Sequence, residues 1–233
     1  MKKIPIYEEV TYVLGLIFLS LGTALTQISD FGLSMIVAPA YILHVKVSQC
    51  LSFFSFGMSG YVLQFFILII LCLILRKFKP IYLMSFCTAV IKGFILDGCL
   101  MITKDFPIGE MWERIIYFVL GIIVCAIGVA FLLKTYIAPE VCDLFVKEIT
   151  KNFNFKINKV KTIYDCSSLV FAIVLSVIFF GLQKPIGMGV GTVICALING
   201  TLITMFIKLF DRIFDYKRLI KFRKDRHEES KLK

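Results

Sequence analysis

The segment YIAPEVCDLFVKEITKNFNFKINKVKTIYD, residues 136–165, separates two long apolar runs and carries both charges and helix-forming signals. Pro139 suits the first turn of a helix, and beyond it apolar residues recur at spacings of three and four. This spacing predicts an amphipathic helix over residues 139–150, with Glu140 in its first turn. In this position, between two membrane-length runs, the helix could direct its charged side chains toward the protein interior at the edge of the membrane.

The chain around this segment has the composition of an integral membrane protein. Hydrophobic residues make up 59% of its 233 residues and charged residues 18%, whereas an average soluble domain is roughly 45–50% apolar and about 25% charged. A bilayer-spanning helix needs about 20 apolar residues. Six runs of about that length are present, at residues 10–28, 50–75, 81–102, 115–133, 163–182 and 185–209.

The net charge of +10 is distributed unevenly between the predicted loops. With the N-terminus inside, the inner segments contain Lys79, Lys159 and most other basic residues. The outer loops contain few, among them Lys104 and Lys184. This asymmetry follows the positive-inside rule and predicts that both termini are cytoplasmic. The basic charge therefore orients the chain in a membrane, and no nucleic-acid partner is expected.

The basic tail, residues 211–233, has two interpretations. Its interleaved apolar and basic side chains would let it continue the last helix along the membrane surface, in contact with anionic lipid. The simpler alternative, which we favour, is that its charge only anchors the topology. The expected partners are thus the lipid bilayer, anionic lipid at the tail, and a small solute whose identity the sequence does not indicate.

Three landmarks recur in the same order in both halves of the chain, at an offset of 105 to 107 residues. They are the glycine pairs Gly15/Gly22 and Gly121/Gly128, the dipeptides Lys79-Pro80 and Lys184-Pro185, and the glycines Gly93 and Gly200. Each half contains three spans, an odd number, so the halves enter the membrane from opposite sides. The predicted fold is therefore all-α and polytopic, with two inverted three-helix repeats, residues 1–105 and 106–210, before the tail.

Two short segments occupy equivalent places in these repeats. Residues 30–46 are too polar and too short to span a bilayer, and residues 139–150 form the amphipathic helix described above. Inverted repeats of this kind are the usual build of secondary transporters, whose sites lie between the repeats and include interrupted helices. We therefore expect the two segments to be re-entrant or interfacial helices. The alternative is two surface helices that cover a bundle.

Ionisable residues at membrane depth usually face the protein interior or a wet cavity, which makes them candidates for a binding site. Glu140, Lys161 and Asp165 are predicted to form one charge cluster that faces the space between the halves. Gln64 is interpreted as a helix-to-helix hydrogen bond. The complete set of predicted substrate-binding residues is Glu140, Lys161, Asp165, Lys92, Asp97, Gln27, Gly191, Thr192 and Asn199.

Other kinds of site are not expected. The 8 cysteines are scattered without CxxC pairs or a neighbouring histidine, so they are interpreted as packing residues. The glycines of residues 187–192 do not follow a strand, which argues against a dinucleotide loop. No catalytic residue, metal or cofactor is predicted, and we do not expect an enzyme.

The chain resembles the YczE/YyaS/YitT-type bacterial integral membrane proteins, specifically the YczE-like branch. The resemblance is carried by Gly15 and Gly22, residues 31–34 and 76–80, Asp97, Pro139-Glu140, Val160-Lys161, residues 164–167, and Gly191-Thr192. It implies a multi-pass protein of the bacterial cell membrane and supplies no substrate. The function expected from the predicted architecture is transport of a small solute. The alternative is a membrane scaffold or a regulatory or assembly partner that transports nothing.

Overall fold

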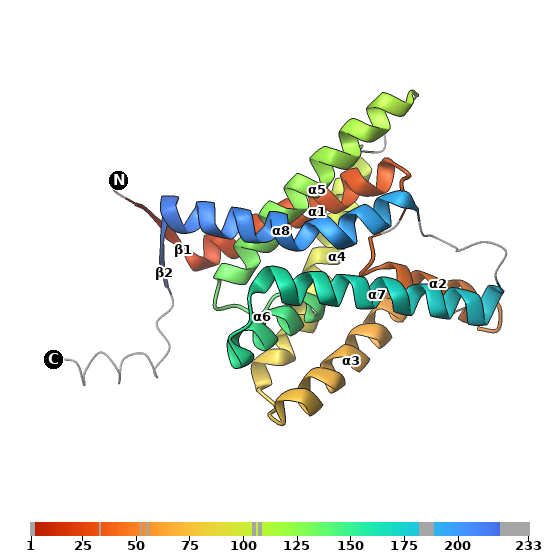
Figure 1. Cartoon of the computed structure of the whole chain (residues 1–233), viewed down its shortest axis with the longest axis horizontal. Helices are drawn as coiled ribbons and strands as arrows, with labels where there is room; N and C mark the ends of the chain where they lie inside the picture. The colour runs from red at the N-terminus through yellow and green to blue at the C-terminus, as the bar shows by residue number, and fades with distance from the viewer. Residues whose placement is uncertain are drawn as a thin grey trace.

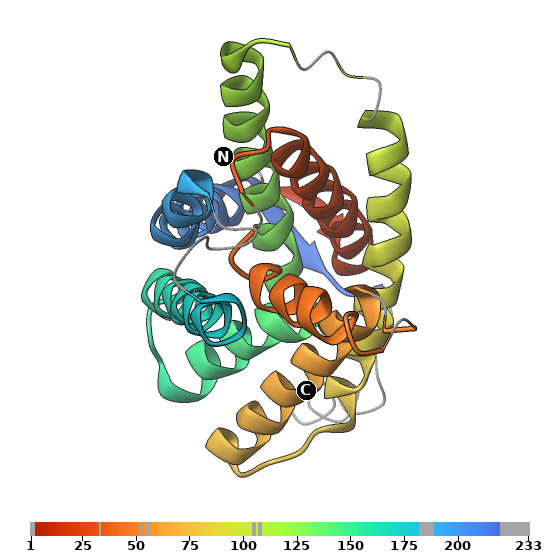
Figure 2. The same ribbon diagram turned by 90° about the vertical axis from the view of Figure 1, so that its right-hand side faces the viewer.

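The computed structural model describes residues 3–32, 34–51, 53–54, 56–103, 106, 109–181 and 189–219. Within them the chain forms eight α-helices (Figures 1 and 2). These are α1 (Glu8–Ile28), α2 (Ala38–Val47), α3 (Phe56–Leu75), α4 (Met84–Thr103), α5 (Met111–Lys134), α6 (Val141–Phe153), α7 (Ile157–Phe180) and α8 (Val190–Ile213). A 3₁₀ turn, Pro80–Tyr82, precedes α4, and the strands β1 (Ile4–Tyr7) and β2 (Phe214–Lys217) flank the helices.

Six of these helices are long and apolar enough to cross a membrane, which confirms the predicted class and the six spans. Their boundaries differ from the predicted ones, because runs of apolar residues do not mark where a helix begins. The helix α7 begins at Ile157, ahead of its apolar run, and so includes Lys161. The start of α3, Phe56, lies later than predicted because residues 48–51 form turns after α2.

The core of the molecule is the close crossing of α1 and α5. A Cβ atom added at Gly22 would lie 2.5 Å from the backbone nitrogen of Cys125, and one added at Gly128 would lie 2.5 Å from that of Leu19. Small residues at these positions let the two backbones touch, as is common between membrane helices. The helix α4 packs on α1, and α8 packs on α5, which completes the central layer (Figure 2).

The two short helices each pack on a long helix of the other half of the chain. The helix α2 lies along α7, where Ser168 donates a hydrogen bond of 2.8 Å to the backbone oxygen of Met35. The helix α6 lies against α3 and buries Val141 and Leu144 there (Figure 1). It begins at Val141, so Glu140 is its N-cap residue and lies just before the first turn rather than in it.

The helical continuation, which was the less favoured interpretation of the tail, does not occur in the residues that the structure describes. The last helix ends at Ile213, and β2 pairs in parallel with β1, with Ile4 opposite Phe214 (Figure 1). The pairing gives hydrogen-bond partners to the backbone groups that face the other strand, and Glu8 accepts a hydrogen bond of 3.2 Å from Arg218. These partners lie at the other end of the chain, so local helical periodicity does not reveal them. Residues 220–233 lie outside the described residues.

Candidate functional site

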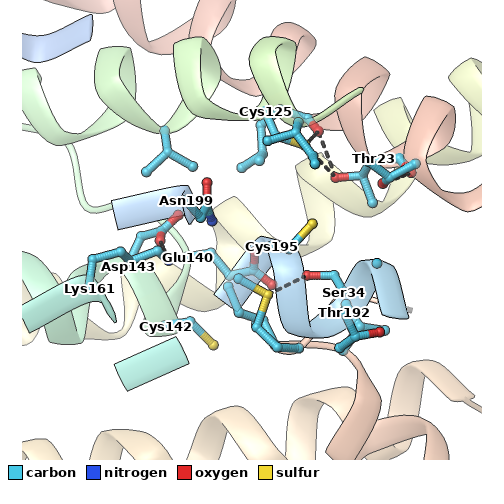
Figure 3. Close-up of a pocket in the computed structure, with 18 of the residues that line it drawn as sticks. Thr23, Ser34, Cys125, Glu140, Cys142, Asp143, Lys161, Thr192, Cys195 and Asn199 are labelled. Atoms are coloured by element: carbon cyan, nitrogen blue, oxygen red, sulfur yellow. Dashed lines mark hydrogen bonds and ion pairs between the residues drawn. The ribbon is translucent and has the colours of Figure 1, made fainter. Parts of the chain in front are cut away.

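A small cavity lies where both halves of the chain meet, between the α1–α5 crossing and the segments that begin α2 and α6. Its volume is about 70 Å³, which is enough for a few water molecules or a small solute. The residues around it include Thr23, Ser34, Cys125, Cys142, Thr192 and Cys195, which are labelled in Figure 3. Residues from α1, α4, α5, α7 and α8 also line it, so the cavity depends on the packing of nearly the whole fold.

Lys92 of α4 and Glu140 form the first ion pair of the cavity. Gln64 of α3 donates a second hydrogen bond to Glu140, at 2.8 Å. The side chains of Lys92 and Glu140 are only 16% and 14% exposed, so this pair is largely withdrawn from water. The ion pair joins the first half of the chain to the second. The prediction grouped Glu140 with Lys161 and Asp165 without naming its ionic partner, which is Lys92, while Glu140 and Lys161 line the same cavity.

Lys161 of α7 forms the second charged group with two carboxylates. Its Nζ donates a hydrogen bond of 2.9 Å to Asp143 and lies 3.5 Å from Asp165, one helical turn further along α7. The three side chains are 1%, 6% and 0% exposed, respectively. The predicted contact of Lys161 with Asp165 is present. Asp143 was missed as a site residue, although it lies three residues after Glu140 and so shares its side of a helix.

Three further predicted residues line the cavity from α8. Thr192 and Asn199 point toward it (Figure 3), and Gly191 packs its backbone against the first half of the chain. The backbone nitrogen of Gly191 donates a hydrogen bond of 3.1 Å to the oxygen of Phe31, and an added Cβ would lie 2.7 Å from the Phe31 side chain. A glycine at this position therefore lets α8 begin against the segment that precedes α2.

Two predicted residues, Gln27 and Asp97, lie outside the cavity. Both side chains are exposed on the surfaces of their helices. Asp97 follows Lys92 by five residues, a spacing that turns it to a different face of α4. Gln27 lies beside Thr26, which does line the cavity, but the next residue along a helix points about 100° away. Whether a polar residue lines the cavity therefore depends on which face of its helix it occupies.

The described residues contain no group of three or more metal-ligating side chains. The cavity thiol outside the membrane-spanning helices, Cys142, is also unsuited to ligation. Burial, reinforced by the neighbouring Glu140 carboxylate, raises the pKa of the Cys142 thiol to about 12. A thiol with that pKa stays protonated at neutral pH, so it is neither a nucleophile nor a ready metal ligand.

Beyond the cavity, contacts with charged side chains hold α6 in place. Glu148 accepts hydrogen bonds from Lys79 at 2.6 Å and from Tyr82 at 2.7 Å. Burial raises the pKa of Glu148, but these two hydrogen bonds outweigh it and hold that pKa below its usual value. Burial lowers the pKa of Lys147 to about 8, and its ammonium group donates to the backbone oxygen of Thr135. The helix that carries Asp143 is therefore fixed to its neighbours along its length.

The helices and the cavity define a multi-pass helical membrane protein with buried charges in its interior. The chain belongs to a family of unknown function (DUF6198), whose model matches residues 6–208. It is also 31% identical over 209 residues to "Uncharacterized protein YyaS" of Bacillus subtilis (strain 168), an alignment that covers 87% of this chain and 94% of that protein. These matches confirm the resemblance to YyaS-type membrane proteins. No solved structure matches the chain significantly.

Proposed function

We propose that this protein transports a small solute across the membrane, and that the cavity between its two halves is the substrate site. The observation that carries the proposal is the burial of four charged side chains, Lys92, Glu140, Asp143 and Lys161, around a small cavity to which both halves contribute, with a fifth, Asp165, buried beside Lys161. Moving an ion out of water costs several kcal/mol. A scaffold would be as stable with apolar side chains there, whereas a transporter needs polar groups that face its substrate.

The inverted repeat is part of this proposal, and the α1–α5 crossing supports it. A Cβ atom added at Gly22 would lie as close to the backbone nitrogen of Cys125, at 2.5 Å, as one added at Gly128 would lie to that of Leu19. An offset of 106 residues converts Leu19 into Cys125 and Gly22 into Gly128. Exchanging the two halves therefore turns the Gly22–Cys125 contact into the Gly128–Leu19 contact. Such a reciprocal pair of contacts is expected where two equivalent units are related by a two-fold axis.

The packing of the other helices supports the same relation, with one difference. The helix α2 packs on α7 as α6 packs on α3, and α1 packs on α4 as α5 packs on α8. However, α7 packs extensively on α8, while α3 has no comparable contact with α4 among the described residues. In alternating access, two structurally similar repeats adopt different conformations, and the binding site opens to the other side of the membrane when the repeats exchange these conformations. The difference between the α7–α8 and α3–α4 contacts is consistent with this mechanism.

The orientation proposed for the halves is tested by labelling single cysteines. In a background without the 8 native cysteines, a cysteine at position 79 is expected to react with an impermeant reagent from the cytoplasmic side of the cell membrane. A cysteine at position 184, which lies outside the described residues, is expected to react only from the other side. Labelling of both positions from one side would contradict the inverted repeat and the cytoplasmic placement of both termini.

Substrate binding is tested by thermal denaturation of the purified protein against small metabolites. A solute present at 100 times its Kd is expected to raise the free energy of unfolding by about 2.7 kcal/mol. Glu140→Gln is expected to lose this stabilisation, measured against its own melting temperature without solute, because the charge that faces the cavity is gone. Glu148→Gln is the matched control, because that carboxylate pairs with Lys79 away from the cavity.

A solute that stabilises Glu140→Gln as much as the unmodified protein binds elsewhere, which contradicts the proposed site. A solute that passes this test is then added in labelled form to vesicles that contain the protein. Uptake that Glu140→Gln abolishes would establish transport. Binding without uptake, or no stabilising solute at all, would favour the membrane scaffold or regulatory partner.

A further inference from the structure

The buried charges in and directly beside the cavity do not balance. Two lysines, Lys92 and Lys161, face three carboxylates, Glu140, Asp143 and Asp165. With every group ionised, these five side chains would carry one net negative charge in a region from which water is largely excluded. An uncompensated buried carboxylate is strongly destabilising. Either a cation or a proton must therefore accompany the third carboxylate.

The hydrogen bonds identify Asp165 as the carboxylate in excess. Glu140 accepts hydrogen bonds from Lys92 and Gln64, and Asp143 accepts one from Lys161. Asp165 is fully buried, and neither of its oxygens makes a hydrogen bond of normal geometry within the part of the chain that the structure describes, although the Lys161 and Asn199 side chains lie beside it. Its one charged contact is the 3.5 Å approach to Lys161, which is already bonded to Asp143.

The side chain of Asn199 supplies the second observation. Its amide lies beside the Asp165 carboxyl, and its Oδ1 is likewise buried without a hydrogen-bond partner. Buried acceptors are normally paired with donors, and an ionised carboxylate has no hydrogen to give. A protonated Asp165 would supply the missing donor to an acceptor such as the Asn199 oxygen. One proton thus removes the excess charge and supplies one of the missing donors.

We propose that Asp165 holds an exchangeable proton at neutral pH and that this proton is the coupling ion of the transporter. The second part rests on the proposed transport function, and the first does not. On release, the carboxyl O–H bond breaks, the proton passes to a water molecule that reaches Asp165 from the cavity past Lys161 and Asn199, and the carboxylate is left facing the Lys161 ammonium. A metal ion is a poorer occupant, because hard cations need several oxygen ligands and Lys161 lies 3.5 Å away.

The groups around Asp165 are consistent with an exchangeable proton. Lys161 and Tyr164 face it from α7, Asp143 from α6, and Cys195 and Asn199 from α8. The Lys92–Glu140 pair lies across the cavity, and Cys142 lies next to Tyr164. Asp143 opposes ionisation of Asp165 and Lys161 favours it. A shift of Lys161 from one aspartate to the other would therefore change the charge of Asp165 and couple the proton to movement of α7 against α6.

Infrared spectroscopy of the purified full chain tests the proton directly, through the carbonyl stretch of a protonated carboxylic acid at neutral pH. The unmodified protein is expected to show this band and Asp165→Asn to lose it. Asparagine has the shape of the neutral acid, so the melting temperature of this variant is expected to stay close to that of the unmodified protein. Asp143→Asn is also expected to lose the band, because Lys161 is then free to pair with an ionised Asp165.

Glu148→Gln is the control and is expected to keep the band, since Glu148 lies outside the cavity and is paired with Lys79. Absence of the band from the unmodified protein, or its persistence at full strength in either aspartate variant, would overturn the proposal. Either variant is sufficient if the other fails to fold. Because no substrate is needed, a protein that has the band but transports nothing would refute the proposed function and leave the proton site established.

Discussion

Lys161→Met is expected to lower the free energy of unfolding by about 3–5 kcal/mol, the cost of removing one partner from a buried ion pair. The Nζ of Lys161 donates to Asp143 at 2.9 Å, and both side chains are almost fully buried. Its loss leaves the Asp143 carboxylate without a counter-charge in an environment of low dielectric. Thermal or denaturant unfolding in detergent measures the effect.

The matched control is Lys79→Met, which also removes a lysine from an ion pair. Lys79 is 44% exposed, and its partner Glu148 keeps the hydrogen bond from Tyr82. Solvent-exposed pairs contribute no more than about 1 kcal/mol, so this variant is expected to lose at most that amount. Adding Asp143→Leu to Lys161→Met is expected to recover stability, because the uncompensated charge is removed. Equal losses for Lys161→Met and Lys79→Met would contradict the buried pair.

Gly22→Ala and Gly128→Ala are each expected to destabilise the protein by about 3 kcal/mol, the upper end of the effects of overpacking. An added methyl group would lie 2.5 Å from a backbone nitrogen of the opposite helix in both cases. Backbone atoms in the middle of a helix cannot move aside as a flexible side chain can. The two helices must therefore separate, and the cavity that they wall must change with them.

Gly93→Ala tests whether this effect is specific to the crossing. Among the described residues, no atom outside the adjacent backbone of α4 lies within 4 Å of a Cβ added at Gly93. Its replacement is expected to change stability by no more than about 1 kcal/mol, the difference in helix propensity between glycine and alanine. Melting temperatures of the three variants, measured together, separate loss of close packing from the general effect of a helix glycine. A tolerated Gly22→Ala would show that α1 and α5 do not approach as closely as described.

The sequence by itself determined the class of the protein, because length and hydropathy are local properties. Six apolar runs of about 20 residues predicted six spans, and the part of the chain that the structure describes has six helices long and apolar enough to cross a membrane. A helix of that length satisfies its own backbone hydrogen bonds in lipid. The glycine pairs that mark the repeat on the first and fourth spans lie in the structure at the close crossing of α1 and α5. Lys92, Glu140, Lys161 and Asn199 were nominated as site residues because charged or polar groups are costly at membrane depth, and all four line one cavity.

Only the tertiary structure decided which charges are partners. Glu140 pairs with Lys92 of the other half, and Lys161 divides its charge between a residue on its own helix and Asp143 on the preceding one. Such choices depend on the rotation of each helix about its axis, which is set by packing with its neighbours and is not encoded in any one segment. The same reason excludes Asp97 from the cavity. The pairing of β2 with β1 was also decided only by the tertiary structure, because the hydrogen-bond partner of a strand can lie anywhere along the chain.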